Sequence, residues 1–321
     1  SSAASDVYKR QTYNYSNFVY ESSNKLHLYP YNDLNQQIVS HKINIPGNPL
    51  VDSYIDDYNN RVGFFTYTPP HRFLRITSEA EIIKKRIIMP EDTMDVDEQW
   101  KILKKLKLSF DFIPFLKFQN TSINKELFKV IESCKFKSAS PMDVADNLCE
   151  YVNKNFNYKK GVTNVFTKIE EVWYLKTGVC QDFTNILIQL CRIAEIPTRY
   201  VSGYVFAAGR FRGASATHAW VEVYIPNYGW LGFDPTNNCI ADIYHIRLAV
   251  GRNYGDCSPV KGVYKGNETQ IMKVNVVLDT KKIKSKDEVI FENSSSSTLS
   301  KEEDNSSNSF QKHLQMMQQQ Q

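Results

Sequence analysis

The stretch from Thr177 to Pro197, TGVCQDFTNILIQLCRIAEIP, constrains the fold more than any other part of the chain. From Phe183 onward its residues are mostly apolar and they end at a proline, which predicts a helix buried on most of its surface. Such a helix has to be packed by other elements of its domain. Gly178 and Cys180 stand directly before it. We therefore expect a thiol at the N-terminus of a buried helix.

Short strands are predicted from Thr12 to about Ile88. The segments QIVSHKINIP and RFLRITSEAEI alternate apolar and polar residues, and turn sequences such as YND, PGNP and YNN separate the alternating runs. Period-two alternation is typical of half-buried strands, and regularly spaced short strands favour a sandwich. We therefore predict that residues 12–90 form an N-terminal antiparallel β-sandwich domain.

Helices and then strands are predicted after residue 90. Ser140, Pro141 and Asp143 form a helix start, and a further helix runs toward Gly178. After Pro197 the segments TRYVSGYVF, HAWVEVYI, GWLGFDPT and IMKVNVVLD indicate strands. This order predicts an α+β fold in which residues 91–280 form a second domain of helices packed on an antiparallel sheet.

The two ends of the chain differ from the rest in composition. Residues 1–11, SSAASDVYKRQ, do not share the strand pattern, and we set them aside as a disordered or non-native extension. Residues 281–321 consist mostly of Ser, Asn, Glu, Lys and Gln. Such a segment buries too little apolar surface to offset its ordering entropy, so we predict a disordered low-complexity tail.

Charge and cysteine content narrow the functional classes. The net charge is only +4 and the basic residues do not cluster, which argues against a nucleic-acid or membrane-surface partner. No apolar run reaches the length of a membrane helix, and the N-terminus lacks the apolar core of a secretion signal. The six cysteines include no CxxC pair. We therefore expect a cytoplasmic protein with reduced thiols.

Cys180 is the candidate nucleophile. A free cysteine titrates near ~8.5, so its reactive thiolate needs stabilisation, and a helix N-terminus offers partial positive charge and unpaired N–H groups. Gly178 would let the backbone turn into the helix and leave room for a substrate. The alternative is that Cys180 is an ordinary small buried residue, which is how we interpret Cys134, Cys149 and Cys191.

His218 and Asp234 supply the partners that a cysteine nucleophile needs. His218 begins one predicted strand and Asp234 ends the next, with PNYG as the turn between them. A base takes the thiol proton and an acceptor fixes the orientation of the base. Side chains on a strand alternate between the two faces of the sheet. His218 and Asp234 therefore share a face only if the numbers of two residues paired across the hairpin add up to an even number. This requires a connecting loop with an odd number of residues, or a bulge. A structural histidine and a strand-ending aspartate are the alternative.

The sequences GVCQDF, HAWVEVY and GWLGFDPTN together resemble the bacterial transglutaminase-like family of the papain-like cysteine-enzyme superfamily. The resemblance extends to YNNRVGFF and PHRFLRI, which look like the N-terminal β-sandwich of that family, and to GRNYGDCSPVKGVYKG. It implies a papain/transglutaminase-like core in which Cys180 is the nucleophile, His218 the general base and acid, and Asp234 the orienting acceptor. We expect no cofactor.

Other residues near these motifs are candidates for supporting roles. The backbone N–H of Cys180 is the first candidate for an oxyanion donor, and the second donor is left open among Gln181, Trp173 and Tyr204. Trp220 shares a face with His218 and either walls the substrate cleft or packs in the core. Asp182 is interpreted as a helix cap. We expect no metal site, since His245 and Asp242 look isolated in the sequence.

Three functions remain open. We predict a cysteine-dependent amide-bond enzyme with a peptide or protein substrate, and hydrolysis as its first reaction, because amine transfer needs an acceptor site that excludes water. The second hypothesis is a protein-glutamine transglutaminase, and the third is a non-catalytic binding module on the same fold. The sequence fixes neither the substrate nor the oligomeric state.

Overall fold

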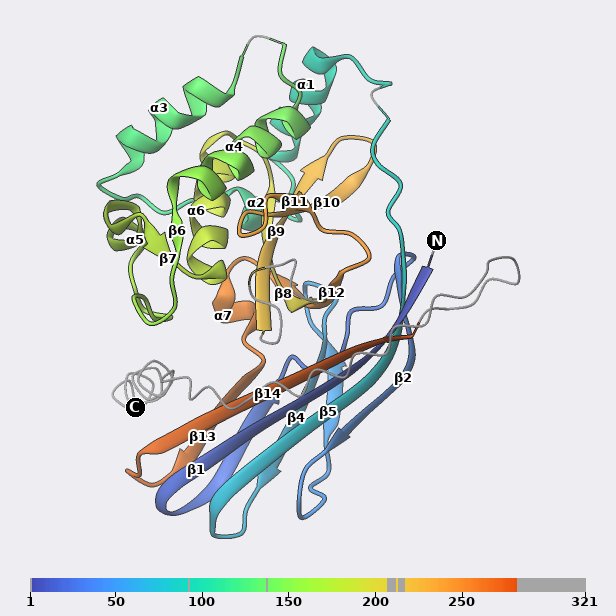
Figure 1. The fold of residues 1–321 in the computed structure, drawn as a ribbon, viewed down its shortest axis with the longest axis vertical. Coiled ribbons are helices and arrows are strands. Elements are labelled where there is room, and N and C mark those ends of the chain that lie inside the picture. Colours follow the sequence, from blue (N-terminus) through green and yellow to red (C-terminus); the bar gives the residue numbers. More distant parts are fainter. Residues whose placement is uncertain (1, 92, 137, 207–211, 213–216, 282–321) are drawn as a thin grey trace.

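The N-terminal part of the chain forms one antiparallel sheet. The computed structural model describes residues 2–91, 93–136, 138–206, 212 and 217–281. Seven strands form the sheet, with β2-β5-β1-β4-β3 as its main path and with β13 and β14 also paired to β1 (Figure 1). Their bounds are β1 Ser2–Leu26, β2 Gln36–Asn44, β3 Asp52–Ile55, β4 Arg61–Tyr67, β5 His71–Lys85, β13 Val260–Lys265 and β14 Gln270–Lys281.

Strand β1 makes this sheet curl. Its first part, Ala4–Tyr15, pairs with β14 and its last part, Tyr20–Leu26, pairs with β4 and β13, with register shifts between the two parts. The predicted β-sandwich is therefore a single curled sheet whose long central strand serves both halves. The curl encloses an apolar core: Tyr13, Tyr15, Val19, Leu26, Leu28, Ile45, Phe65, Leu74, Ile76 and Val260.

Two of the predicted boundaries are wrong. Residues 2–11 are not a disordered extension, because they form the first part of β1 and pair with β5. Residues 260–281 do not belong to the second domain, because β13 and β14 pair with β1 and complete the N-terminal sheet. Without them, one edge of β1 would present unpaired backbone groups. The predicted disordered tail lies, apart from Lys281, outside the described residues.

The middle of the chain forms helices on an antiparallel sheet, so the predicted α+β class is confirmed. The sheet order is β11-β10-β9-β8-β12. The helices are α1 Val96–Leu106, α2 Ile113–Leu116, α3 Asn124–Cys134, α4 Pro141–Asn155, α5 Ile169–Leu175, α6 Cys180–Ile193 and α7 Tyr254–Cys257. The strands are β6 Asn157–Tyr158, β7 Thr177–Gly178, β8 Thr198–Val205, β9 Thr217–Ile225, β10 Gly229–Asp234, β11 Cys239–Ile240 and β12 His245–Gly251. Ser140 and Asp143 form the predicted capping box of α4.

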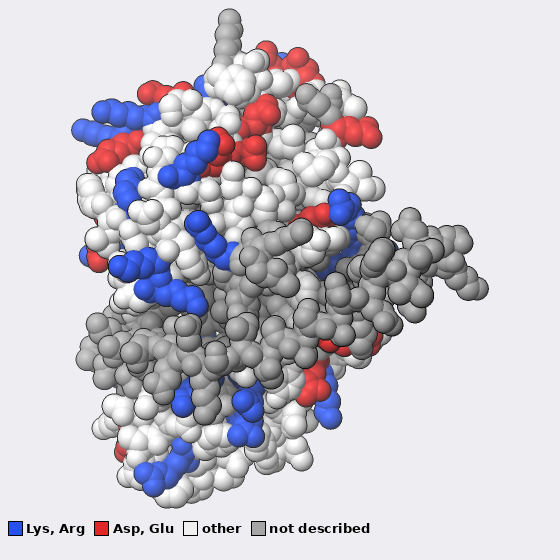
Figure 2. All heavy atoms as spheres, viewed as in Figure 1, with Lys and Arg blue, Asp and Glu red and all other residues white. Residues whose placement is uncertain are grey.

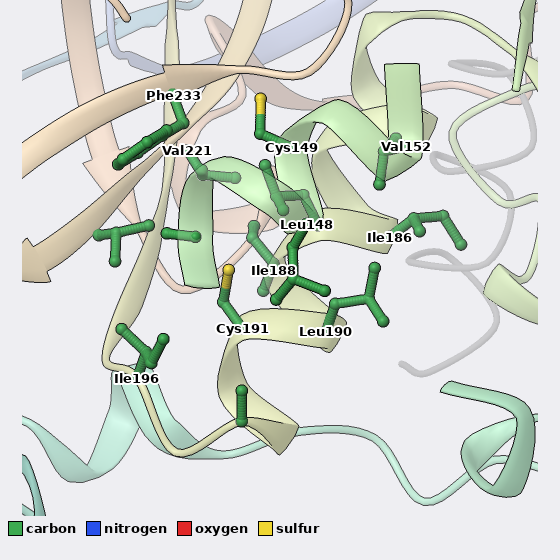
Figure 3. Close-up of a cluster of buried hydrophobic side chains, with 14 of the residues drawn as sticks. Leu148, Cys149, Val152, Ile186, Ile188, Leu190, Cys191, Ile196, Val221 and Phe233 are labelled. Atoms are coloured by element: carbon green, nitrogen blue, oxygen red, sulfur yellow. The ribbon is translucent and has the colours of Figure 1, made fainter. Parts of the chain in front are cut away.

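Helix α6 is the buried element around which this part is built. Its side chains meet those of α4 and of strands β9 and β10, as Figure 3 shows for Ile188, Leu148, Val221 and Phe233. Cys191 is fully buried in the same cluster, as expected for a core residue. Because α6 is packed on several sides, its first turn is held rigidly against the sheet.

The N-terminal sheet also packs against the sheet of the helical part. Val7, Ile82 and Val276 contact Tyr204, Ile246 and Leu248 of β8 and β12 in a separate apolar cluster. Over the helices, the face in Figure 2 carries basic and acidic side chains close to one another. Within the described ranges, no helix is long and apolar enough to cross a membrane.

Candidate functional site

Cys180 is the first residue of α6, as the sequence predicts. The carboxylate of Asp182 accepts the N–H of Val179 (2.8 Å) and the hydroxyl of Thr163 (2.5 Å), which confirms its capping role. The N–H groups of Cys180 and Gln181 come before the first intrahelical hydrogen bonds, so both point out of the helix end. A Cβ at Gly178 would lie 2.5 Å from Asp182 Oδ2, so this glycine makes room for the cap rather than for a substrate.

The β9–β10 hairpin brings His218 and Asp234 together. Paired residues such as Gly229 with Ile225 and Phe233 with Val221 have an even number sum, 454, and the loop 226–228 has an odd length. His218 and Asp234 therefore share a face of the sheet, which meets the condition set by the sequence. His218 Nε2 lies 2.8 Å from Asp234 Oδ2, and both side chains are inaccessible to solvent.

The protonation of His218 follows from its surroundings. Burial lowers its pKa, but the charge and hydrogen bond of Asp234 and the nearby Cys180 sulfur outweigh burial and raise the pKa to about 10. Burial raises the pKa of Asp234, whereas His218 and His245 hold it well below its usual range. The other ring nitrogen of His218, Nδ1, has no hydrogen-bond partner among the described residues. Nδ1 is thus free to exchange a proton with the thiol.

Asp234 is held from several directions. Its Oδ1 accepts the backbone N–H groups of Thr236 (2.9 Å) and Asn237 (3.3 Å), and its Oδ2 accepts the side-chain amide of Asn237 (2.7 Å). A second histidine, His245, places Nε2 at 3.1 Å from the same Oδ2. The view that His245 is isolated is therefore wrong.

His245 lies only 11 residues from Asp234 in the sequence, but its place beside that carboxylate depends on the order of the strands in the sheet. It begins β12, which lies at the opposite edge of the sheet from β11, and no local pattern reports that crossover. Ligand atoms of His218, Asp234 and His245 lie within 4.8 Å of one another, a spacing that could hold a metal ion. The hydrogen bonds among the three side chains account for this convergence without one.

Trp220 packs in the core and is not a wall of an open cleft. Trp220 is 1% exposed. Its ring centroid lies 6.1 Å from that of His218 with an interplanar angle of 27°, and 5.2 Å from that of His245 with an interplanar angle of 76°. A Cβ on Gly203 would lie 2.1 Å from the carbonyl oxygen of Ile246 and 2.5 Å from the Trp220 ring. Gly203 therefore gives Trp220 the space to support both histidines.

The structure separates the candidates for the second oxyanion donor. Trp173 donates its indole N–H to Glu126 (2.7 Å), so that group is already engaged. Tyr204 is buried in the apolar cluster at the junction of the two sheets. Gln181 directly follows Cys180 in the first turn of α6 and is partly exposed. Of the three, Gln181 is the residue next to the thiol.

The protonation of His218 gives a testable pH dependence. A histidine with an unfolded pKa near ~6.5 and a folded value of about 10 stabilises the fold fully below pH ~6.5, and loses this contribution as the pH rises to 10. The quantity to compare is the difference in unfolding free energy between wild type and His218→Gln. We expect this difference to fall by up to about 1.4 kcal/mol for each pH unit between pH ~6.5 and ~10. Urea unfolding at pH 6 to 10 measures the difference.

His41→Gln is the matched control. Burial lowers the pKa of His41 to about 4, and its unfolded form titrates around pH ~6.5, so neither form changes its charge above pH ~7.5. The corresponding difference for His41 should therefore be flat above pH ~7.5, where that for His218 is still falling. A flat difference for His218 as well would contradict the raised pKa.

Two family models match the two parts of the chain. Residues 131–235 match the family model of the transglutaminase-like superfamily, and residues 6–83 match that of the bacterial transglutaminase-like N-terminal region. The first match includes Cys180, His218 and Asp234 but ends before His245.

Relatives are similar along most of the chain. An uncharacterized protein of Mycobacterium tuberculosis is 30% identical over 287 residues, which cover 84% of this chain and 90% of the relative. A crystal structure from Cytophaga hutchinsonii, provisionally described as a cysteine protease, has a TM-score of 0.70 at 20% identity and covers 92% of this chain and 95% of its own. A Pseudomonas aeruginosa protein-glutamine gamma-glutamyltransferase is 36% identical over 67 residues, only 19% of this chain and 10% of that protein.

Proposed function

Since the chain belongs to the transglutaminase-like superfamily, a cysteine-based enzyme family, we propose that it cleaves amide bonds through a thioester on Cys180. The observation that carries this proposal is the fully buried pair of His218 and Asp234 beside a thiol at the start of a helix. A nucleophile, its base and an acceptor that orients the base are the parts that covalent acyl transfer requires.

Each residue has a step in the proposed reaction. His218 carries a proton at neutral pH and stabilises the thiolate of Cys180, which attacks the substrate carbonyl. The N–H groups of Cys180 and Gln181 then bind the oxyanion. His218 donates its proton from Nδ1 to the leaving amine, and the thioester remains. Neutral His218 next removes a proton from water, which releases the acid and regenerates the thiol.

Two reactions can follow the thioester, and hydrolysis is our first proposal. Water needs no built site, whereas amine transfer requires an acceptor pocket from which water is excluded. Transglutamination is the second candidate, and the short match to the Pseudomonas aeruginosa glutamyltransferase favours it. We further propose a peptide or protein as substrate and a cytoplasmic location.

One experiment separates these reactions. The wild-type chain is incubated with a peptide library, with and without a labelled primary amine, and products are identified by mass spectrometry. We expect hydrolysed amides in both conditions, a Cys180 acyl-enzyme, and no turnover in Cys180→Ala. Labelled amine on glutamine side chains would instead indicate transglutamination.

The half-buried Cys134 provides the control thiol. Cys134→Ala should keep turnover and the acyl-enzyme, because this residue lies at the end of α3, away from His218. Turnover that survives in Cys180→Ala would refute the proposed nucleophile. No acyl-enzyme and no product in wild type would favour a binding module.

A further inference from the structure

Asp234 lies between two buried histidines that come from different strands. His218 reaches Oδ2 from β9 at 2.8 Å, and His245 reaches the same oxygen from β12 at 3.1 Å. The His245 side chain is only 2% exposed. The proposed mechanism uses His218 and Asp234 but leaves His245 without a role.

The two histidines differ in charge. Burial lowers the pKa of His245, and the hydrogen bond to Asp234 does not outweigh burial. The charged groups that act on His245 are Asp234, His218 and Lys84. Asp234 thus has one cationic partner and one neutral partner. A neutral imidazole that donates Nε2–H stabilises the buried carboxylate without competing for its charge.

The geometry limits how Asp234 can rotate. Backbone N–H groups hold Oδ1, whereas Oδ2 takes its direction from side chains. Trp220 packs edge-to-face on His245 and nearly parallel to His218, so one indole fixes both imidazole rings. His245 is thus a second imidazole donor to Oδ2, on a strand separate from that of His218.

We propose that His245 is a positioning residue, which donates its Nε2–H to Asp234 Oδ2 and keeps this oxygen aligned with His218 throughout turnover. This inference rests on the proposed function of Cys180, His218 and Asp234. In this role His245 acts through Asp234.

Two substitutions test the donor. Gln can place an N–H donor near the position of the imidazole Nε2, whereas Leu fills space without a donor. Loss of one hydrogen bond to a charged group predicts that His245→Leu lowers kcat by about 10- to 100-fold with little change in KM. His245→Gln should recover most of kcat. His27→Leu removes another buried histidine, bonded to Ser258 O, and should leave kcat unchanged.

A second measurement does not depend on turnover. In ¹⁵N-histidine-labelled protein at pH 7, NMR should show His245 as the neutral tautomer protonated at Nε2 and His218 protonated on both nitrogens. The His218 Nε2 signal should shift in His245→Leu and return toward the wild-type position in His245→Gln.

The outcomes separate the two proposals. A charged His245, a proton on Nδ1 in place of Nε2, or equal effects of Gln and Leu would overturn the positioning role. An inactive wild type would instead count against the proposed function, and the NMR measurement would still decide whether His245 holds Asp234 and His218 in place.

Discussion

Replacing Asp234 by Asn is expected to lower kcat by about 10⁴-fold, the effect of the same change in a serine-protease triad. The amide oxygen can still accept the N–H groups of Thr236 and Asn237 that now bond to Oδ1. Its NH₂ group would then face three donors, from His218, His245 and the Asn237 side chain. His218 must turn or move its proton to Nδ1, and either change removes the base from Cys180.

The measurement is kcat and KM with an amide substrate found in the peptide library, together with the rate at which iodoacetamide alkylates Cys180. KM should change little, because Asp234 is fully buried and does not reach the substrate. Asp242→Asn is the control. The Asp242 side chain accepts the N–H of Ile87 and pairs with Arg86, contacts outside the site. Its backbone oxygen, which accepts the N–H of His245, is unchanged in Asn, so the variant should keep wild-type kcat. A loss below tenfold in Asp234→Asn would contradict the role of Asp234.

The sequence predicts the site residues that carry local signals and misses the one whose placement depends on strand order. Cys180 was found because a helix start has local signals, and His218 and Asp234 because one hairpin carries both. The three-residue loop 226–228 gives the even register sum that places both side chains on one face. In contrast, His245 reaches Asp234 from a strand at the other edge of the sheet, and periodicity contains no information on strand order.

The same limit explains the errors in the fold. Residues 270–281 have a clear strand pattern, but their partner β1 lies more than 250 residues earlier in the chain. The curl of β1 depends on register shifts after Asn14, where Ser16 and Asn17 are turn-type residues but the strand continues unbroken. For Trp220, the alternation of side chains predicts that it shares a face with His218, but it does not predict whether the indole lines a cleft or packs in the core. Only the contacts with Gly203 and the two histidine rings show that the indole is packed.

Replacing Glu222 by Ala is expected to lower the free energy of unfolding by about 3–5 kcal/mol, the cost of breaking a buried ion pair. Glu222 is 6% exposed and bridges two guanidinium groups, Arg199 at 2.6 and 2.7 Å and Arg247 at 2.7 Å. Arg247 also pairs with Asp33 of the N-terminal part. Without Glu222, Arg199 keeps only the face of the Trp230 ring as a charge-stabilising contact among the described residues.

Urea unfolding with a common m-value measures the effect. Glu150→Ala is the matched control: Glu150 pairs with Lys154 on the surface of α4 and is 47% exposed, so its loss should cost at most about 0.5 kcal/mol. A cost below about 1 kcal/mol for Glu222→Ala would mean that the arginines find other partners.

The activity of Glu222→Ala then shows what this network does. Glu222 lies four residues after His218 on β9, and Arg247 lies two residues after His245 on β12, on the strands that carry the site. If the network only joins the N-terminal part to these strands, kcat per folded molecule stays at the wild-type value while stability falls. If it also sets the separation of β9 and β12, His218 and His245 lose their common alignment on Asp234, and kcat falls together with stability.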